Sequence, residues 1–316
     1  MACRSTAVGY RIVSWRRALG LDKGSVVRYI CLVVPSWNST HSDMNGQRIK
    51  QTFEALRREG RPGLIVFITA GFPDKKATLE LVPELVAAGA DLVELGVPFS
   101  DPLAEGPTIQ ESSFRGLQER VTLEDCLDMV AELRGRVPDT PLILMGYYNP
   151  IYSHGLARFA QDAGRMGVDG IIVVDLPQFE AGPLAAHCAP NGIPMITLLA
   201  PTSTEESIKA ACAGAEGFIY CISVTGVTGQ RAQVSDRGFE LLERVRGHTD
   251  LPLAVGFGIS RREHVVQVGL KAEAAVVGSA LVRVMIESPR DQVVERASRF
   301  VAELAGNRLP VNGGSG

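Results

Sequence analysis

Two acidic residues in the segment ELGVPFSDPLAEGP are the strongest candidates for chemistry in this sequence. Glu94 lies near the end of an apolar run, residues 92–96, which has the character of a buried strand. Burying a carboxylate without a partner disfavours its charged form and raises its pKa. A carboxyl group with a pKa near neutrality suits a general acid or base; a structural ion pair is the alternative interpretation.

The second acid, Glu105, follows in the same loop, which is stiffened by prolines at positions 98, 102 and 107. Asp101 is expected to anchor this loop by accepting hydrogen bonds from backbone amides. Two carboxylates on one rigid loop can hold different protonation states when their surroundings differ. The pair therefore predicts proton transfer with separate roles for the two groups.

Glycine-rich turns follow the last two apolar runs of the sequence, at residues 256–260 (GFGIS) and 278–279. Glycine lets backbone N–H groups approach an anion, and the start of a following helix adds positive potential. We therefore expect a phosphate there; ordinary tight turns are the alternative. A polar loop, residues 223–230 (SVTGVTGQ), could close over the site as a lid, with Gly229 supplying a further amide, or could be a disordered surface loop.

Eight short apolar runs, rich in Val and Ile and mostly without polar alternation, predict parallel strands that are buried on both faces. They are residues 64–69, 92–96, 142–147, 170–174, 194–199, 217–222, 253–257 and 274–278. Helical segments are predicted at the amphipathic stretch around Ile49, Phe53 and Leu56, and at residues 75–88, 122–136, 156–164, 182–188, 204–213, 237–246, 261–269 and 293–304.

This alternation predicts a single (β/α)8 TIM barrel over residues 44–307, an α/β fold of the usual size for eight such units. A doubly wound open sheet is the alternative, but it usually carries a GxGxxG turn after its first strand, where this chain has TAGFP. Barrel enzymes place their chemistry on the loops that follow the strands. Those loops hold Glu94, Glu105 and the glycine turns.

Composition excludes several other classes of protein. The net charge of −3 gives no basic field for nucleic acid, and no apolar run is long enough to span a membrane. The six cysteines form no CxxC pair and the histidines no HxH or HExxH motif, so we assign no metal and expect reduced thiols in the cytoplasm.

Residues 1–43 differ from the rest of the chain: they hold both tryptophans and six Arg or Lys residues against two Asp. A targeting peptide is one interpretation, because the segment is rich in Arg and Ser and poor in acids. We favour an upstream extension before a second start at Met44, disordered or absent from the mature chain. Residues 308–316 are expected to form a flexible tail.

The motifs together resemble the alpha chain of tryptophan synthase, from Met44 to about Leu304. The segments that carry the resemblance are FITAGFP, ELGVPFSDPLAEGPTIQ, VVDLP, SVTGVTG, GFGIS and VVGSA, in this order. The resemblance implies a lyase that cleaves indole-3-glycerol phosphate by a retro-aldol reaction in tryptophan biosynthesis. It also implies no cofactor on this chain and a beta chain partner that carries pyridoxal phosphate, in an α2β2 heterotetramer.

The same resemblance assigns roles to individual residues. Glu94 would protonate the indole carbon, and Glu105 would accept a hydrogen bond from the indole N–H. Three aromatic residues would line the indole pocket: Phe67, Tyr147 and Tyr220. The phosphate would be held by Gly229, Gly258, Gly278 and Ser279, and Thr228 would lie in the closing lid. From the residues alone, Tyr220 is either a core tyrosine or one that faces the Glu94 carboxyl.

One departure from the family pattern concerns Glu105, where the family usually has Asp. The extra methylene displaces the carboxylate by roughly one bond length, although the charge is kept, and we expect activity to survive. Three alternatives stay open: a stand-alone lyase, a non-catalytic subunit that activates a beta chain, and another phosphate-binding barrel such as indole-glycerol-phosphate synthase. The last relies on catalytic lysines near strand ends, and none of the apolar runs contains Lys.

Overall fold

The structure, a computed structural model, describes residues 46–222, 236–256 and 258–307. Within these ranges eight parallel strands form one sheet in the order β4-β3-β2-β1-β8-β7-β6-β5. Their bounds are β1 Gly63–Thr69, β2 Leu92–Gly96, β3 Leu142–Gly146, β4 Gly170–Val173, β5 Thr197–Leu199, β6 Ile219–Ile222, β7 Leu253–Gly256 and β8 Ala274–Val277. A parallel bridge between Ile171 and Met195 joins β4 to the segment that leads into β5 and closes the barrel.

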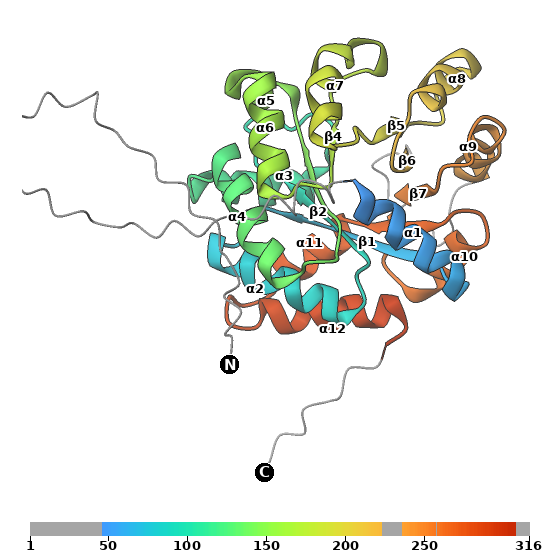
Figure 1. Ribbon diagram of the computed structural model, residues 1–316. Coiled ribbons are helices and arrows are strands. Elements are labelled where there is room, and N and C mark those ends of the chain that lie inside the picture. Colours follow the sequence, from blue (N-terminus) through green and yellow to red (C-terminus); the bar gives the residue numbers. More distant parts are fainter. Residues whose placement is uncertain (1–45, 223–235, 257, 308–316) are drawn as a thin grey trace, which may run out of the picture. The chain divides into compact units, whose positions relative to one another are not determined.

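Helices follow the strands and surround the sheet (Figure 1). Their bounds are α1 Gln47–Glu59, α2 Lys75–Ala88, α3 Pro107–Gln118, α4 Leu123–Arg136, α5 Tyr148–His154, α6 Leu156–Met166, α7 Gly182–Cys188, α8 Glu205–Ala213, α9 Asp236–Arg246, α10 Arg262–Gly269, α11 Ser279–Ile286 and α12 Val293–Ala305, with short 3-10 turns at Gln178–Glu180 and Ala189–Asn191. The predicted TIM barrel is confirmed. No helix in these ranges is long and apolar enough to cross a membrane.

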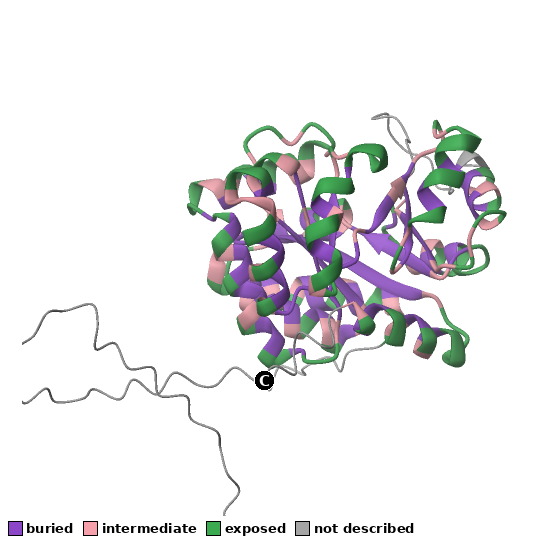
Figure 2. Ribbon diagram, turned by 45° about the horizontal axis from the view of Figure 1, so that its top comes forward, coloured by how far each residue is buried: buried purple, intermediate pink, exposed green. Residues whose placement is uncertain are grey.

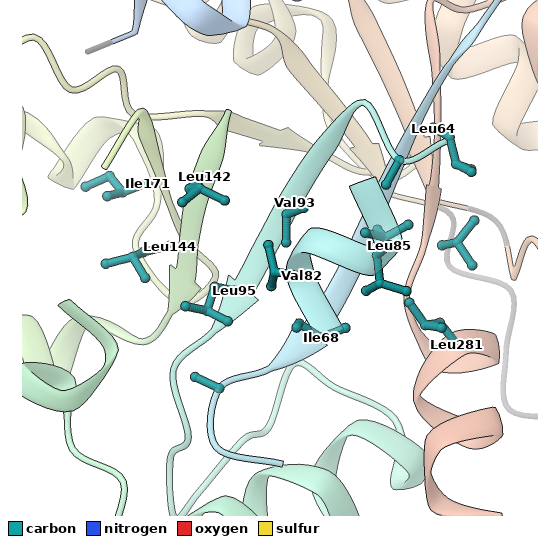
Figure 3. Packing of buried hydrophobic residues seen from close by; sticks show 14 of the residues in the cluster. Leu64, Ile68, Val82, Leu85, Val93, Leu95, Leu142, Leu144, Ile171 and Leu281 are labelled. Carbon is teal, nitrogen blue, oxygen red and sulfur yellow. The ribbon is translucent and has the colours of Figure 1, made fainter. Parts of the chain in front are cut away.

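Both faces of the strands are buried, which explains why the sequence shows no polar alternation. All seven residues of β1 are buried, and the strands lie between an inner and an outer apolar layer (Figure 2). In the outer layer, Val82 and Leu85 of α2 belong to one apolar cluster with Val93 and Leu95 of β2, and Val82 lies beside Val93 (Figure 3). The inner layer fills the barrel, so only its ends can hold a site.

Helix α1 closes the amino-terminal end of the barrel. Its residues Ile49, Phe53 and Leu56 belong to the inner apolar layer, and the Phe53 and Phe218 ring centroids are 5.7 Å apart. A buried ion cluster fixes the helix in place: Asp169 accepts hydrogen bonds from Arg48 of α1 at 2.9 Å and from Arg134 of α4 at 2.5 Å. The carboxyl ends of the strands are therefore the open end.

Two helices, α3 and α5, lie where the sequence predicted none. Each of these helices contains a proline, Pro107 in α3 and Pro150 in α5, and a proline in the sequence usually indicates that a helix is interrupted there. Pro107 is the first residue of α3 and Pro150 the third of α5, where an N–H group has no acceptor within the helix in any case. Other helix starts agree with prediction: Thr122 forms a capping box with Asp125 at the start of α4.

Candidate active site

Four of the predicted site residues point into the barrel near its carboxyl end. Side chains alternate between the two faces of a strand. The side chains of Ile65 in β1, Leu92 in β2 and Ile143 in β3 pack inside the barrel. Phe67 and Glu94 stand two positions after the first two of these, and Tyr147, just after β3, stands four positions after Ile143, so their side chains point the same way. The residues on this inner face are Phe67, Glu94, Tyr147 and Tyr220.

Glu94 is completely buried in β2, between Phe67 of β1 and Ile143 of β3 in the strand ladders. Neither of its carboxylate oxygens has a hydrogen-bond partner among the described residues. Burial in these apolar surroundings raises the pKa of Glu94 to about 8. The alternative interpretation, a structural ion pair, is therefore not observed among the described residues.

Two glycines make room for the aromatic side chains of the inner face. A Cβ atom at Gly96 would overlap the edge of the Phe67 ring, and one at Gly256 would lie 2.7 Å from the Tyr220 hydroxyl. The Phe67 ring can thus lie over Gly96 of β2, and the Tyr220 ring can lie over Gly256 of β7. The lack of a side chain at both positions has a packing reason that the sequence alone did not reveal.

Tyr220 is 9% exposed and lies within electrostatic range of Glu94. Burial raises the pKa of its phenol well above the ordinary value, and the Glu94 charge raises it further. Tyr220 therefore stays protonated. Of the two interpretations of this tyrosine, the structure supports the one that places it near the Glu94 carboxyl.

Glu105 is held by Tyr147, the residue that precedes α5. The Tyr147 hydroxyl donates a hydrogen bond to Glu105 Oε2 and accepts one from the Ala104 N–H at 2.9 Å. Burial raises the pKa of Glu105, while the Tyr147 hydrogen bond opposes that rise. Burial also raises the pKa of Tyr147, with its bond to Glu105 adding to the effect.

A small cavity brings three predicted residues together: Phe67, Glu105 and Tyr147 line it with Thr69, Gly96, Val97, Pro102, Ile109, Ser113 and Met145. Gly278 is close by, since a Cβ atom there would lie 3.6 Å from Phe67 and 3.7 Å from Ile109. The lining mixes apolar side chains with the polar side chains of Thr69 and Ser113, and its one carboxylate is that of Glu105.

The prediction that Asp101 anchors the loop through backbone amides is wrong in the described structure. Its carboxylate is exposed and accepts a hydrogen bond from the Ser100 hydroxyl at 2.5 Å. The loop is held instead by Ser113, which exchanges hydrogen bonds with the Phe99 backbone, and by Gln110, which donates to the Glu105 carbonyl at 2.9 Å. Helix α3, which was not predicted, brings both residues to the loop.

The glycine turns lie at the same end of the barrel. Gly258 is exposed after β7 with a φ of +65°, and Gly278 is the N-cap of α11, so the exposed Ser279 is the first residue of that helix. The first N–H groups of a helix have no acceptor within it, which leaves them available to an anion. Thr228 and Gly229 lie outside the described residues.

Comparison with known proteins decides the family. Residues 53–307 match the family described as tryptophan synthase alpha chain. A tryptophan synthase alpha chain of Roseiflexus castenholzii is 49% identical over 259 residues, 82% of this chain and 99% of the relative. The chain belongs to the tryptophan synthase alpha chain family.

Solved structures agree with this assignment to the tryptophan synthase alpha chains. A tryptophan synthase subunit alpha from Legionella pneumophila has a TM-score of 0.76 and 35% identity, with 82% of this chain and 97% of that one covered. A tryptophan synthase from M. tuberculosis has a TM-score of 0.74 and 32% identity over similar shares of 82% and 97%.

The family and the activity that the motifs predicted are thereby confirmed. The chain is an alpha subunit of tryptophan biosynthesis, with the alpha reaction that cleaves indole-3-glycerol phosphate. Indole-glycerol-phosphate synthase, the third alternative considered from the sequence, is set aside by the same match.

Sequence reasoning on this alpha chain missed several residues that shape the site. Phe99 stacks on the Tyr147 ring with centroids 4.7 Å apart, and Asp175 accepts a hydrogen bond from the Tyr148 N–H at 2.8 Å. Phe99 lies in the segment ELGVPFSDPLAEGPTIQ, and Asp175 lies in VVDLP. No local signal in either segment says which ring or backbone amide these side chains meet.

Proposed function

We propose that Glu94 is both the acid and the base of the cleavage of indole-3-glycerol phosphate to indole and glyceraldehyde 3-phosphate. With a pKa of about 8 its carboxyl is mostly protonated at neutral pH and can donate a proton to the indole carbon that carries the side chain. The carbon–carbon bond then breaks and its electron pair returns to the ring. The carboxylate left on Glu94 takes the proton of the side-chain hydroxyl as that carbon becomes an aldehyde.

Glu105 supports this step, in our proposal, by accepting a hydrogen bond from the ring N–H. Protonation of the indole carbon makes the ring cationic, and a nearby carboxylate stabilises that charge. Phe67, Tyr147 and Tyr220 would enclose the ring. Gly229, Gly258, Gly278 and Ser279 would hold the phosphate, with Thr228 in a closing lid. The observation that carries the proposal is the buried Glu94 carboxyl, which has no hydrogen-bond partner among the described residues and lies on the same barrel face as the cavity residues.

We further propose a beta chain as partner, in an α2β2 assembly, in the cytoplasm. Three successive connections after β2, β3 and β4 each expose a large apolar side chain: Leu103 at 91%, Tyr152 at 65% and Phe179 at 86%. Exposed apolar side chains grouped around a site favour a protein interface. Pyridoxal phosphate is expected on the beta chain, with none on this chain.

The test is an assay of indole-3-glycerol phosphate cleavage with and without a co-expressed beta chain, together with the mass of the complex in solution. Stimulation by a bound beta chain in an α2β2 complex supports the proposal. Full activity without any binding of a beta chain would identify a stand-alone lyase. Binding with stimulation of the beta chain but no cleavage would identify a non-catalytic activating subunit.

A further inference from the structure

The loop that carries Glu105 is arranged around a single side chain, Tyr147. The Phe99 ring stacks on the Tyr147 ring with an interplanar angle of 26° at the start of the loop. At its far end, the Ala104 N–H and the Glu105 carboxylate both bond the Tyr147 hydroxyl. One residue on a different strand end therefore meets the loop at three points.

The direction of these hydrogen bonds is fixed by chemistry. A backbone N–H can only donate, so the Ala104 amide occupies a lone pair of the Tyr147 oxygen. The hydroxyl proton is thus free to point at Glu105 Oε2. Tyr147 itself is 5% exposed and is fixed at the start of α5, where Asp175 binds the next backbone N–H.

We propose that Tyr147 is a positioning residue for Glu105: its hydroxyl holds the longer glutamate side chain at the rim of the indole cavity, ready to accept the ring N–H. This inference rests on the proposed role of Glu105. Glutamate has one more rotatable bond than aspartate, so its carboxylate needs an external contact to stay within the narrow geometry that catalysis demands. The Tyr147 hydroxyl is the contact that the structure supplies.

The pKa of Glu105 can test the role of Tyr147, because it depends on the Tyr147 hydroxyl and not only on packing. Burial and the charge of Asp175, from the loop after β4, raise the pKa of Glu105, whereas the Tyr147 hydroxyl lowers it. Removing that hydroxyl should therefore raise the pKa of Glu105. Since Glu105 acts as the carboxylate, the acidic limb of the pH profile of kcat/KM should move to higher pH.

The experiment compares Tyr147→Phe with Ser207→Ala in the alpha–beta complex. Tyr147→Phe keeps the ring that stacks on Phe99 and removes only the hydroxyl. Ser207→Ala removes an exposed hydroxyl from α8. We expect kcat/KM of the first variant to fall on the order of tenfold to a hundredfold, with its acidic limb at higher pH. The second variant should match the parent. An unmoved acidic limb in Tyr147→Phe would overturn the proposal.

Two further variants separate this role from packing and from failure of the proposed function. Phe99→Leu removes the ring stack but leaves the Tyr147 hydroxyl in place. The pKa of Glu105 is followed by carbon-13 NMR, and Glu105→Gln identifies its signal. This pKa should move less in Phe99→Leu than in Tyr147→Phe. Equal shifts in both variants would overturn the positioning role. If Glu105→Gln keeps full activity, the proposed function of Glu105 is wrong. If Glu105→Gln is inactive but Tyr147→Phe has the rate and pH profile of the parent, only the positioning role of Tyr147 is wrong.

Discussion

Glu94 of β2 lies directly opposite Phe67 of β1 in the parallel ladder, and both side chains point into the barrel. An ionisable group and an aromatic ring that are 27 positions apart thus become neighbours at one level of the barrel. Complete burial raises the pKa of the Glu94 carboxyl to about 8.

Glu94→Gln should abolish cleavage while substrate still binds. The amide keeps the size of the side chain but cannot donate and retake a proton, and loss of general acid–base catalysis typically costs on the order of 10²- to 10⁴-fold in rate. Steady-state cleavage and equilibrium binding of the substrate measure the two effects. Glu84→Gln, at an exposed position on α2, is the matched control and should leave both unchanged. An active Glu94→Gln enzyme would refute the mechanism.

Glu94 should also make stability depend on pH. Its pKa is raised from 4.5 in the unfolded chain to about 8 in the folded protein. The folded state therefore binds more protons between these values, and its contribution, full below pH 4.5, is lost as pH rises toward 8, on the order of 1.4 kcal/mol per pH unit. Urea unfolding of parent and Glu94→Gln across this range should show a steeper decline in the parent. Parallel curves would contradict the raised pKa.

Replacing Glu105 by the residue usual in the family should be tolerated, and the parent should be active as it stands. The carboxylate of Glu105→Asp would retract from the Tyr147 hydroxyl by roughly one bond length while its charge is kept, so we expect a loss in kcat/KM of at most about a hundredfold. Cleavage by both proteins is measured with the beta chain present. An inactive parent beside an active Glu105→Asp variant would show that the glutamate has disabled the site.

Gly96→Ala should displace the Phe67 ring and impair both stability and substrate binding. The added methyl group would overlap the ring edge, and overpacking of a tight core costs about 1–3 kcal/mol. Gly135→Ala in α4 is the control, because no atom of the described ranges lies within 4 Å of its Cβ position and alanine there should stabilise the helix by about 0.4–1 kcal/mol. Chemical denaturation and KM report the outcome; an unaffected KM in Gly96→Ala would remove Phe67 from the substrate pocket.

Asp169→Ala should destabilise the barrel strongly without touching the chemistry. The substitution leaves the Arg48 and Arg134 guanidinium groups buried without their shared carboxylate, a loss of about 3–5 kcal/mol. Asp128→Ala, at an exposed position of α4, should change the free energy of unfolding far less. The folded fraction of Asp169→Ala should keep its kcat, since the cluster lies at the end of the barrel that α1 closes. A loss of kcat in fully folded protein would contradict this separation.

The strands were predictable from the sequence because a strand buried on both faces is a short apolar run in itself. Helices with a local cap were also predictable, because the capping residues stand within a few positions of each other in the sequence. Helix α4, which Thr122 and Asp125 cap, is an example. Helices α3 and α5 were not, because Pro107 and Pro150 are tolerated only through their places in the first turn. Glu94 could be chosen as a site residue since a carboxylate in an apolar run is conspicuous.

The sequence by itself determined the barrel, the family and the presence of two carboxylates on one loop, because these depend on residue types and their spacing along the chain. The tertiary structure decided what surrounds each carboxylate. Glu94 has no partner among the described residues, while Glu105 is bound by a tyrosine 42 positions away. Burial and hydrogen bonding set the protonation of a carboxyl group, and both arise only when distant strand ends meet at one end of the barrel.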